Sequence, residues 1–160
     1  MATFIHVFAE AARRSIQRRG IKAGQYAKKR GTGVYASPVT QDYYFTHQWC
    51  REIKRQQNVP KLVARFRIPD DEEVYIGRYG VQHIRVAASA AIRIAREHVA
   101  PAGLEVIIPR SIKPKEILKI YKPAKALGWR YYPEAKGKKP CGCAYCQKGE
   151  PYSAAKKKAA

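Results

Sequence analysis

The sequence predicts an α+β fold with one main domain. The chain has 160 residues, of which 46% are hydrophobic, enough to build one core. Short apolar runs that alternate with a period of two are interleaved with segments of helical periodicity. Glycine and proline residues separate these short segments. We therefore expect nine elements in the order β-α-β-α-β-β-α-β-β within residues 1–122.

The first four elements follow from local patterns. Phe4–Phe8 predicts a short strand centred on His6, and the Ala- and Arg-rich segment 9–19 predicts a helix that stops at Gly20. Val34–Ala36 predicts a second strand, which Ser37-Pro38 ends. A second helix is expected to begin after Asp42, a good N-cap residue, and to run to about residue 57.

The other five elements lie between residues 62 and 121. Segment 62–68 predicts a strand, because apolar residues alternate there with Arg65 and Arg67. The remaining expectations are a strand at 74–77, a helix at 84–98, and strands at 104–108 and 116–121.

The composition changes at residue 123. Residues 1–122 form the expected main domain, and residues 123–160 form a basic, aromatic and cysteine-containing extension with repeated proline and glycine. The final Ala-Ala-Lys-Lys-Lys-Ala-Ala is typical of a segment that is disordered or helical only when bound.

The charge predicts a nucleic-acid partner, either DNA or RNA. The chain has 32 Lys and Arg residues against 12 Asp and Glu, a net charge of +20. A polyanion would offset the self-repulsion of such a protein. An acidic membrane is the weaker alternative, because no apolar stretch is long enough to span a bilayer. The first residues lack the order of an export signal, so we expect a cytoplasmic protein with no membrane partner.

Three closely spaced thiols, Cys141, Cys143 and Cys146, suggest a zinc site in the extension. Structural zinc takes four ligands, and Cys50 is the first candidate for the fourth, with His47 or His98 as substitutes. Such a site would pin the extension onto the domain. The alternative is a cluster of reduced thiols, as expected in a reducing cytosol.

Two ionisable residues stand out within predicted strands. Glu105 lies in the apolar segment Leu104–Ile108, where an acid either faces solvent or has a specific role. His6 could likewise be a hydrogen-bonded structural residue or a ligand contact. The loop Lys28–Gly33 adds cations and two glycines that allow a phosphate to approach the backbone. It matches neither the Walker phosphate-loop motif nor the Gly-x-Gly-x-x-Gly dinucleotide motif.

Together these segments resemble the ADP-ribosyltransferase superfamily. The resemblance lies in the His6 strand, the helix ending at Gly20-Ile21, the segment 33–38, and the segment from Glu105 through Ile117, and it spans residues 4–121. It is closest to the DarT-like branch, whose members modify nucleic acids, and more distant from the RNA 2′-phosphotransferases. It implies a split pair of small mixed β-sheets flanked by helices, with NAD as a substrate in the cleft between them.

The resemblance also implies roles for individual residues. His6 would contact the adenosine-side ribose, Tyr35 would pack on the nicotinamide, and Glu105 would contact the nicotinamide ribose as a catalytic residue. Arg30 would be the second catalytic residue, with Lys29 and Gly33 at the cofactor phosphates. The chain lacks a Gln-x-Glu or Glu-x-Glu pair at Glu105, which argues against modification of protein arginines.

We therefore expect an NAD-dependent ADP-ribosyltransferase that modifies DNA or RNA, as a toxin or defence component of a bacterium or phage, with an antitoxin protein as a possible partner. Glu105 would stabilise the positive charge that develops on the ribose as nicotinamide leaves. A non-catalytic, zinc-stabilised nucleic-acid-binding module and an RNA 2′-phosphotransferase-like enzyme are the alternatives. A ribosomal protein fits the composition but not the acid within an apolar strand.

Overall fold

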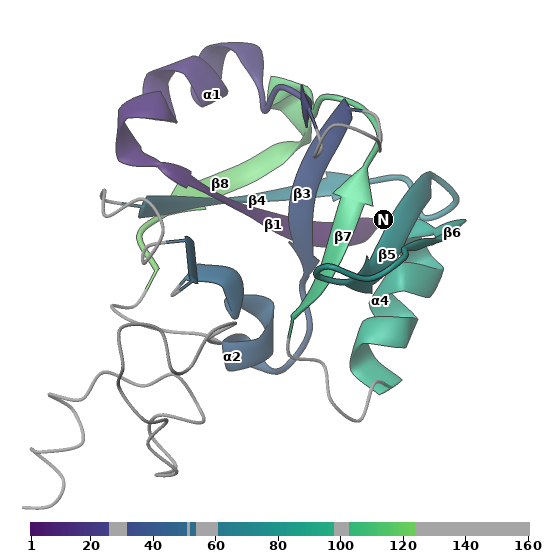
Figure 1. Cartoon of the computed structure of the whole chain (residues 1–160). Helices are drawn as coiled ribbons and strands as arrows, with labels where there is room; N and C mark the ends of the chain where they lie inside the picture. Colours follow the sequence, from purple (N-terminus) through teal and green to yellow (C-terminus); the bar gives the residue numbers. More distant parts are fainter. Residues whose placement is uncertain (26–31, 51, 54–60, 98–102, 124–160) are drawn as a thin grey trace, which may run out of the picture.

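The computed structural model describes residues 1–25, 32–50, 52–53, 61–97 and 103–123 (Figure 1). This part of the chain is an α+β fold, as the sequence predicts. Its strands are β1 (Ala2–Ala9), β2 (Gly24–Gln25), β3 (Thr32–Pro38), β4 (Lys61–Ile68), β5 (Glu73–Arg78), β6 (Ile84–Ala87), β7 (Leu104–Ile108) and β8 (Ile117–Tyr121). Its helices are η1 (Glu10–Ala12), α1 (Arg13–Arg19), α2 (Tyr43–Thr46), α4 (Ala88–Glu97) and η2 (Pro114–Glu116).

The strands form one antiparallel sheet, and its central strands β1 and β3 are joined by a short pairing that we call the seam. Its order is β6-β5-β7-β3-β1-β4-β8, and β2 pairs with β3. Strands β1 and β4 pair along their whole length, from Ala2 opposite Ile68 to Ala9 opposite Lys61. Strands β1 and β3 share only the pairs Phe4–Pro38 and Ile5–Ser37. Beyond this seam the two parts of the sheet diverge, as Figure 1 shows for β1 and β3.

One face of the sheet carries the main core. The alternation predicted for segment 62–68 is confirmed, because the apolar residues of β4 from Leu62 to Ile68 pack into this core at every second position. Ile16 of α1 and Ala91 of α4 pack into the same cluster. A smaller cluster on the opposite face contains Ile5, Cys50 and Val63. Helix α4 therefore covers the core face of β3, β5 and β6 and does not cover their opposite face.

The predicted helix at 84–98 is wrong over its first turn. Residues Ile84–Ala87 form β6, which pairs with β5 from Glu73 opposite Ala87 to Ile76 opposite Ile84. Ile84 and Val86 fit the two-residue period of a strand as well as the period of a helix. A short apolar run therefore does not distinguish a strand from a helix. The hairpin decides in favour of the strand, since Gly80 takes a positive φ of 79° in the connecting turn.

The two earlier helices are also shorter than predicted. Ala9 ends β1, and a 3₁₀ turn precedes α1. The Asp42 cap is confirmed, since its carboxylate accepts a hydrogen bond from the Phe45 amide at 3.0 Å. However, α2 ends at Thr46, and a turn at His47 and Gln48 separates it from the helical residues Trp49 and Cys50.

Gly20 ends α1 because its conformation excludes a side chain. Its φ is 77°, and a Cβ atom there would lie 1.9 Å from the carbonyl oxygen of Ile112. The same carbonyl accepts a hydrogen bond from the Ile21 amide at 2.9 Å. This bridge ties the end of α1 to the segment that leads into β8.

Arg110 joins three segments around β7. Its guanidinium donates to Glu72 at 2.6 and 2.8 Å and to Glu116 at 2.7 and 2.9 Å. These contacts raise the pKa of Arg110. Burial opposes ionisation of Glu116, but the hydrogen bonds from Arg110 and from the Lys113 amide hold its pKa below the ordinary value. Glu72 is thus an ion-pair partner of Arg110, although it lies in the acidic run Asp70-Asp71-Glu72-Glu73.

The extension lies almost wholly outside the described residues, since only Pro123 of residues 123–160 belongs to them. Among the helices of the described part, none is long and apolar enough to cross a membrane.

Candidate functional site

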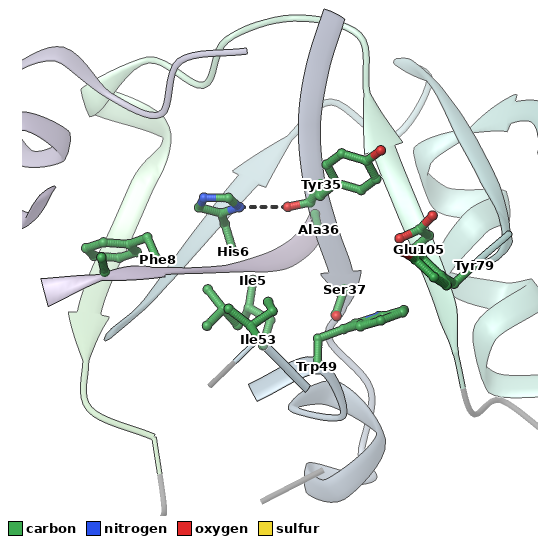
Figure 2. A pocket seen from close by; sticks show the side chains of 12 residues that line it. Ile5, His6, Phe8, Tyr35, Ala36, Ser37, Trp49, Ile53, Tyr79 and Glu105 are labelled. Carbon is green, nitrogen blue, oxygen red and sulfur yellow. Dashed lines mark hydrogen bonds between the residues drawn. The ribbon is translucent and has the colours of Figure 1, made fainter. Parts of the chain in front are cut away.

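A pocket of about 540 Å³ opens where β1 and β3 diverge beyond the seam (Figure 2). This volume is typical of small-molecule sites, which range from roughly 300 to 1,000 Å³. The lining residues come from β1, β3, β7 and the segments after α2 and β5: Ile5, His6, Val7, Phe8, Ala9, Tyr35, Ala36, Ser37, Trp49, Ile53, Tyr79 and Glu105. Three of the predicted site residues, His6, Tyr35 and Glu105, therefore share one pocket.

His6 bridges the two diverging strands. Its Nδ1 lies 2.7 Å from the carbonyl oxygen of Tyr35. Because a carbonyl oxygen can only accept, Nδ1 carries the proton. Burial lowers the pKa of His6, against the opposing effect of the Tyr35 carbonyl, so the ring is neutral at pH 7. In that tautomer Nε2 is a hydrogen-bond acceptor, suited to a hydroxyl donor.

Glu105 is buried rather than solvated. It is 8% exposed, although its side chain lies on the face of the sheet opposite the main core. Oε1 of Glu105 lies 3.2 Å from Nε2 of His83. The interpretation that Glu105 merely occupies a solvated polar face is therefore wrong.

His83 was missed by sequence reasoning, and its position depends on Gly77. Gly77 of β5 pairs with Glu105 of β7. A Cβ atom on Gly77 would lie 2.9 Å from Cγ of His83 and 3.0 Å from the Gln82 carbonyl oxygen. The missing side chain thus makes room for the imidazole beside the carboxylate.

The contacts of His83 indicate how the imidazole holds the carboxylate. Its Nδ1 lies 3.0 Å from the carbonyl oxygen of Val81, which can only accept. With Glu105 at Nε2, both ring nitrogens face oxygen acceptors. The imidazole is an ion partner for the carboxylate only when both of its nitrogens carry a proton.

The segment after α2 braces the start of β7. The Trp49 indole Nε1 donates to the carbonyl oxygen of Leu104 at 2.9 Å, and Gln48 accepts from the Gly103 amide at 2.6 Å. The Trp49 and Tyr79 rings meet edge-on with their centroids 5.6 Å apart. Trp49, Tyr79 and Glu105 all line the pocket (Figure 2). Tyr79 carried no sequence signal.

Of the predicted phosphate-binding residues, Gly33 alone belongs to the described part of the chain. Gly33 is a buried residue of β3 that pairs with Gly24, and it is not among the lining residues. Lys29 and Arg30 lie outside the described residues, so their predicted roles stay predictions.

Of the predicted zinc ligands, Cys50 and the substitute His47 belong to the described part of the chain. Cys141, Cys143, Cys146 and the substitute ligand His98 lie outside the described residues. Cys50 packs against Ile5 and Val63, and burial raises the pKa of its thiol to about 12.

The substitute ligand His47 is also engaged. Its ring nitrogens contact the Tyr43 carbonyl oxygen at 2.8 Å and the Tyr121 hydroxyl at 2.6 Å. Within the described part of the chain, no group of three or more metal-binding side chains is present.

Comparisons with family models, curated proteins and solved structures give no match for this chain. Its function is therefore inferred from the site and the charge.

Proposed function

We propose that this chain is an NAD-dependent ADP-ribosyltransferase that modifies nucleic acid. The observation that carries the proposal is the shared pocket of His6, Tyr35 and Glu105, which come from three different strands. These are the residues that the resemblance assigns to the two ribose groups and the nicotinamide of NAD.

The seam in the sheet supports the finer fold assignment, an ADP-ribosyltransferase-like split pair of sheets. Only two residue pairs join β1 to β3, and the pocket opens directly beyond them. In a split sheet the cofactor cleft lies between the two halves, which is where this pocket lies.

The chemistry of the lining suits the parts of NAD that it would hold. Nε2 of the neutral His6 accepts from a ribose hydroxyl. Aromatic walls at Tyr35 and Trp49 suit a flat nicotinamide ring. The pyrophosphate is assigned to Lys29, Arg30 and Gly33 by the resemblance alone.

Glu105 would supply the electrostatic part of catalysis. As the bond between ribose and nicotinamide breaks, its electron pair leaves with nicotinamide and positive charge develops on the sugar. A fixed carboxylate that accepts a hydrogen bond from a ribose hydroxyl stabilises this charge. The acceptor group of the nucleic acid then forms the new bond to the sugar and loses its proton. A nearby carboxylate can assist this proton transfer.

Burial makes Glu105 more effective in this role. The protein holds the carboxylate before substrate arrives, so little reorganisation is required during the reaction. His83 and Gly77 provide this fixed position, and the Trp49 contact with Leu104 fixes the strand beside it.

The acceptor is assigned to nucleic acid by charge. A net charge of +20 attracts a polyanion over long range and gives strongly salt-dependent binding. A toxin or defence role and an antitoxin partner stay predictions, which expression in a bacterial host with and without candidate neighbouring genes would test.

The proposal is tested by incubating the full chain with NAD and single-stranded DNA and RNA oligonucleotides. We expect mass spectrometry to detect an added ADP-ribose on the oligonucleotide, and NAD to raise the melting temperature. Glu105→Gln should lower the transfer rate by about 100-fold or more while oligonucleotide binding persists. Glu10→Gln, a charge change at an exposed residue of η1, is the matched control and should keep the wild-type rate.

The alternatives give different results in the same experiment. An RNA 2′-phosphotransferase-like enzyme would remove a 2′-phosphate from RNA in an NAD-dependent manner and leave no ADP-ribose on the strand. A non-catalytic binding module, which the net charge alone would support, would show salt-dependent binding and no effect of NAD. Unchanged transfer by Glu105→Gln would refute the catalytic assignment.

A further inference from the structure

Four side chains form a continuous row across the sheet beside the pocket. Tyr35 of β3 pairs with Ile107 of β7, Ile107 pairs with Tyr75 of β5, and Tyr75 pairs with Arg85 of β6. Directly paired residues of antiparallel strands project to the same face. The row therefore crosses four neighbouring strands in one line.

This row lies on the face that α4 does not cover. The residues that alternate with it, including Val34, Val74 and Val106, belong to the main core together with Ala91 of α4. Tyr35 and Tyr75 are 41% and 38% exposed, whereas Ile107 between them is only 6% exposed. The two tyrosines thus flank a buried isoleucine and present a large aromatic surface to solvent.

The row is continuous with the proposed active site. Tyr35 lines the pocket, and Glu105 lies two residues from Ile107 on the same face of β7. Neighbouring strands are about 4.8 Å apart, so Tyr75 lies about 10 Å from Tyr35 across the sheet. A base bound on Tyr75 would therefore lie about 10 Å from a residue that lines the pocket.

We propose that the part of this row beyond the pocket, Ile107-Tyr75-Arg85, is a stacking platform for an unpaired base of the acceptor strand, with Tyr75 as its central residue. The assignment rests on the proposed function for the role of the bound strand, but binding itself does not require NAD. Exposed aromatic side chains on a sheet are surfaces on which bases stack, and a cationic protein attracts the phosphates that carry them.

Charge complementarity favours a nucleic acid over an apolar partner. The exposed guanidinium of Arg85 ends the row on the same face as Tyr75 and contacts Glu73. The chain as a whole carries +20. A strand that stacks on Tyr75 would therefore have the Arg85 cation beside its backbone and the positive charge of the whole chain around it.

The test compares a base-bearing oligonucleotide with an abasic strand of the same length and charge, without NAD. We expect the full chain to bind the base-bearing strand at least fivefold more tightly, because stacking of one base corresponds to about 5- to 150-fold in affinity. Tyr75→Ala should remove most of this difference, and Tyr75→Trp should preserve it. Tyr44→Ala is the control, since Tyr44 is also 38% exposed but lies on α2.

Three results would overturn the platform: equal affinity of the wild-type chain for both strands, equal losses for Tyr75→Ala and Tyr44→Ala, or full binding by Tyr75→Ala. Melting curves of each variant confirm that it is folded. Because this measurement excludes NAD, the platform can fail while ADP-ribose transfer succeeds. Conversely, base-dependent binding through Tyr75 without any transfer would refute only the proposed reaction.

Discussion

Replacing Gly77 by alanine tests how the proposed active site is assembled. A Cβ atom at Gly77 would lie 2.9 Å from Cγ of His83 and 3.0 Å from both the Gln82 carbonyl oxygen and Cα of His83. Two of these three atoms belong to the backbone, so a change of side-chain rotamer cannot relieve the overlap. The turn that carries His83 must move away from β5, and His83 must then move away from Glu105.

The size of the effect follows from two opposing contributions. Overpacking typically costs about 1–3 kcal/mol, whereas alanine in a strand is more favourable than glycine by about 0.5–1 kcal/mol. We expect Gly77→Ala to lower the free energy of unfolding by a net of about 1–2 kcal/mol. For a domain of this size, that loss lowers the melting temperature by roughly 2–8 °C.

Two other glycines calibrate the measurement. A Cβ atom at Gly24 of β2 would have no heavy atom within 4 Å, so Gly24→Ala should not destabilise the protein and should raise its stability by up to about 1 kcal/mol. Gly20→Ala should be the most destabilising of the three, because it combines a positive φ with a 1.9 Å overlap on Ile112. Denaturant unfolding and thermal melting of the three variants give the order directly.

A double variant with His83→Ala tests whether Gly77 makes room for the imidazole. His83→Ala removes the Cγ contact but not the backbone contacts, so the double variant with Gly77→Ala should be less destabilised than the sum of the single variants. If Gly77→Ala melts with the wild-type protein, or if the two changes are additive, then the glycine does not make room for the imidazole. On the proposed function, Gly77→Ala should also slow ADP-ribose transfer while oligonucleotide binding persists.

Two further predictions concern buried titratable groups. Burial lowers the pKa of both His6 and His47, so the unfolded chain binds protons more readily than the folded protein. The contribution of these residues to the free energy of unfolding should be fully present above the ordinary histidine pKa of 6.5 and should decrease as pH drops below it. Denaturant unfolding between pH 8 and pH 5.5 measures this slope, which His6→Gln should reduce, and a slope unaffected by that change would contradict the assignment. Burial raises the pKa of Cys50 to about 12, so iodoacetamide at pH 8 should label Cys50 much more slowly in the folded protein than in denaturant. Peptide mapping measures the two rates, and rapid labelling of folded Cys50 would show that its thiol is not buried.

Several features of the fold were predictable because they depend on local patterns. Alternation identified β4 with its buried side chains, Asp42 was recognised as a helix cap, and Gly20 as a helix stop. The hairpin at Ile84–Ala87 was missed, since its strand character comes from pairing with β5 and not from its own residues. The turn at His47 and Gln48 was missed for the same reason, because Gln48 and Trp49 contact the start of β7, far away in the chain.

The residues of the candidate site also differ in whether local sequence or strand pairing determines them. The placement of single ionisable residues in apolar strands singled out His6 and Glu105, and the composition predicts a polyanionic partner, because these inferences depend on residue type and immediate neighbours. His83, Tyr79 and the row through Tyr75 depend on which strands are adjacent and in which register. Tertiary structure alone decided that the sheet opens beyond two residue pairs of β1 and β3, and that Gly77 lies opposite Glu105. Cross-strand pairing fixes these neighbours, and no local sequence pattern specifies the pairing.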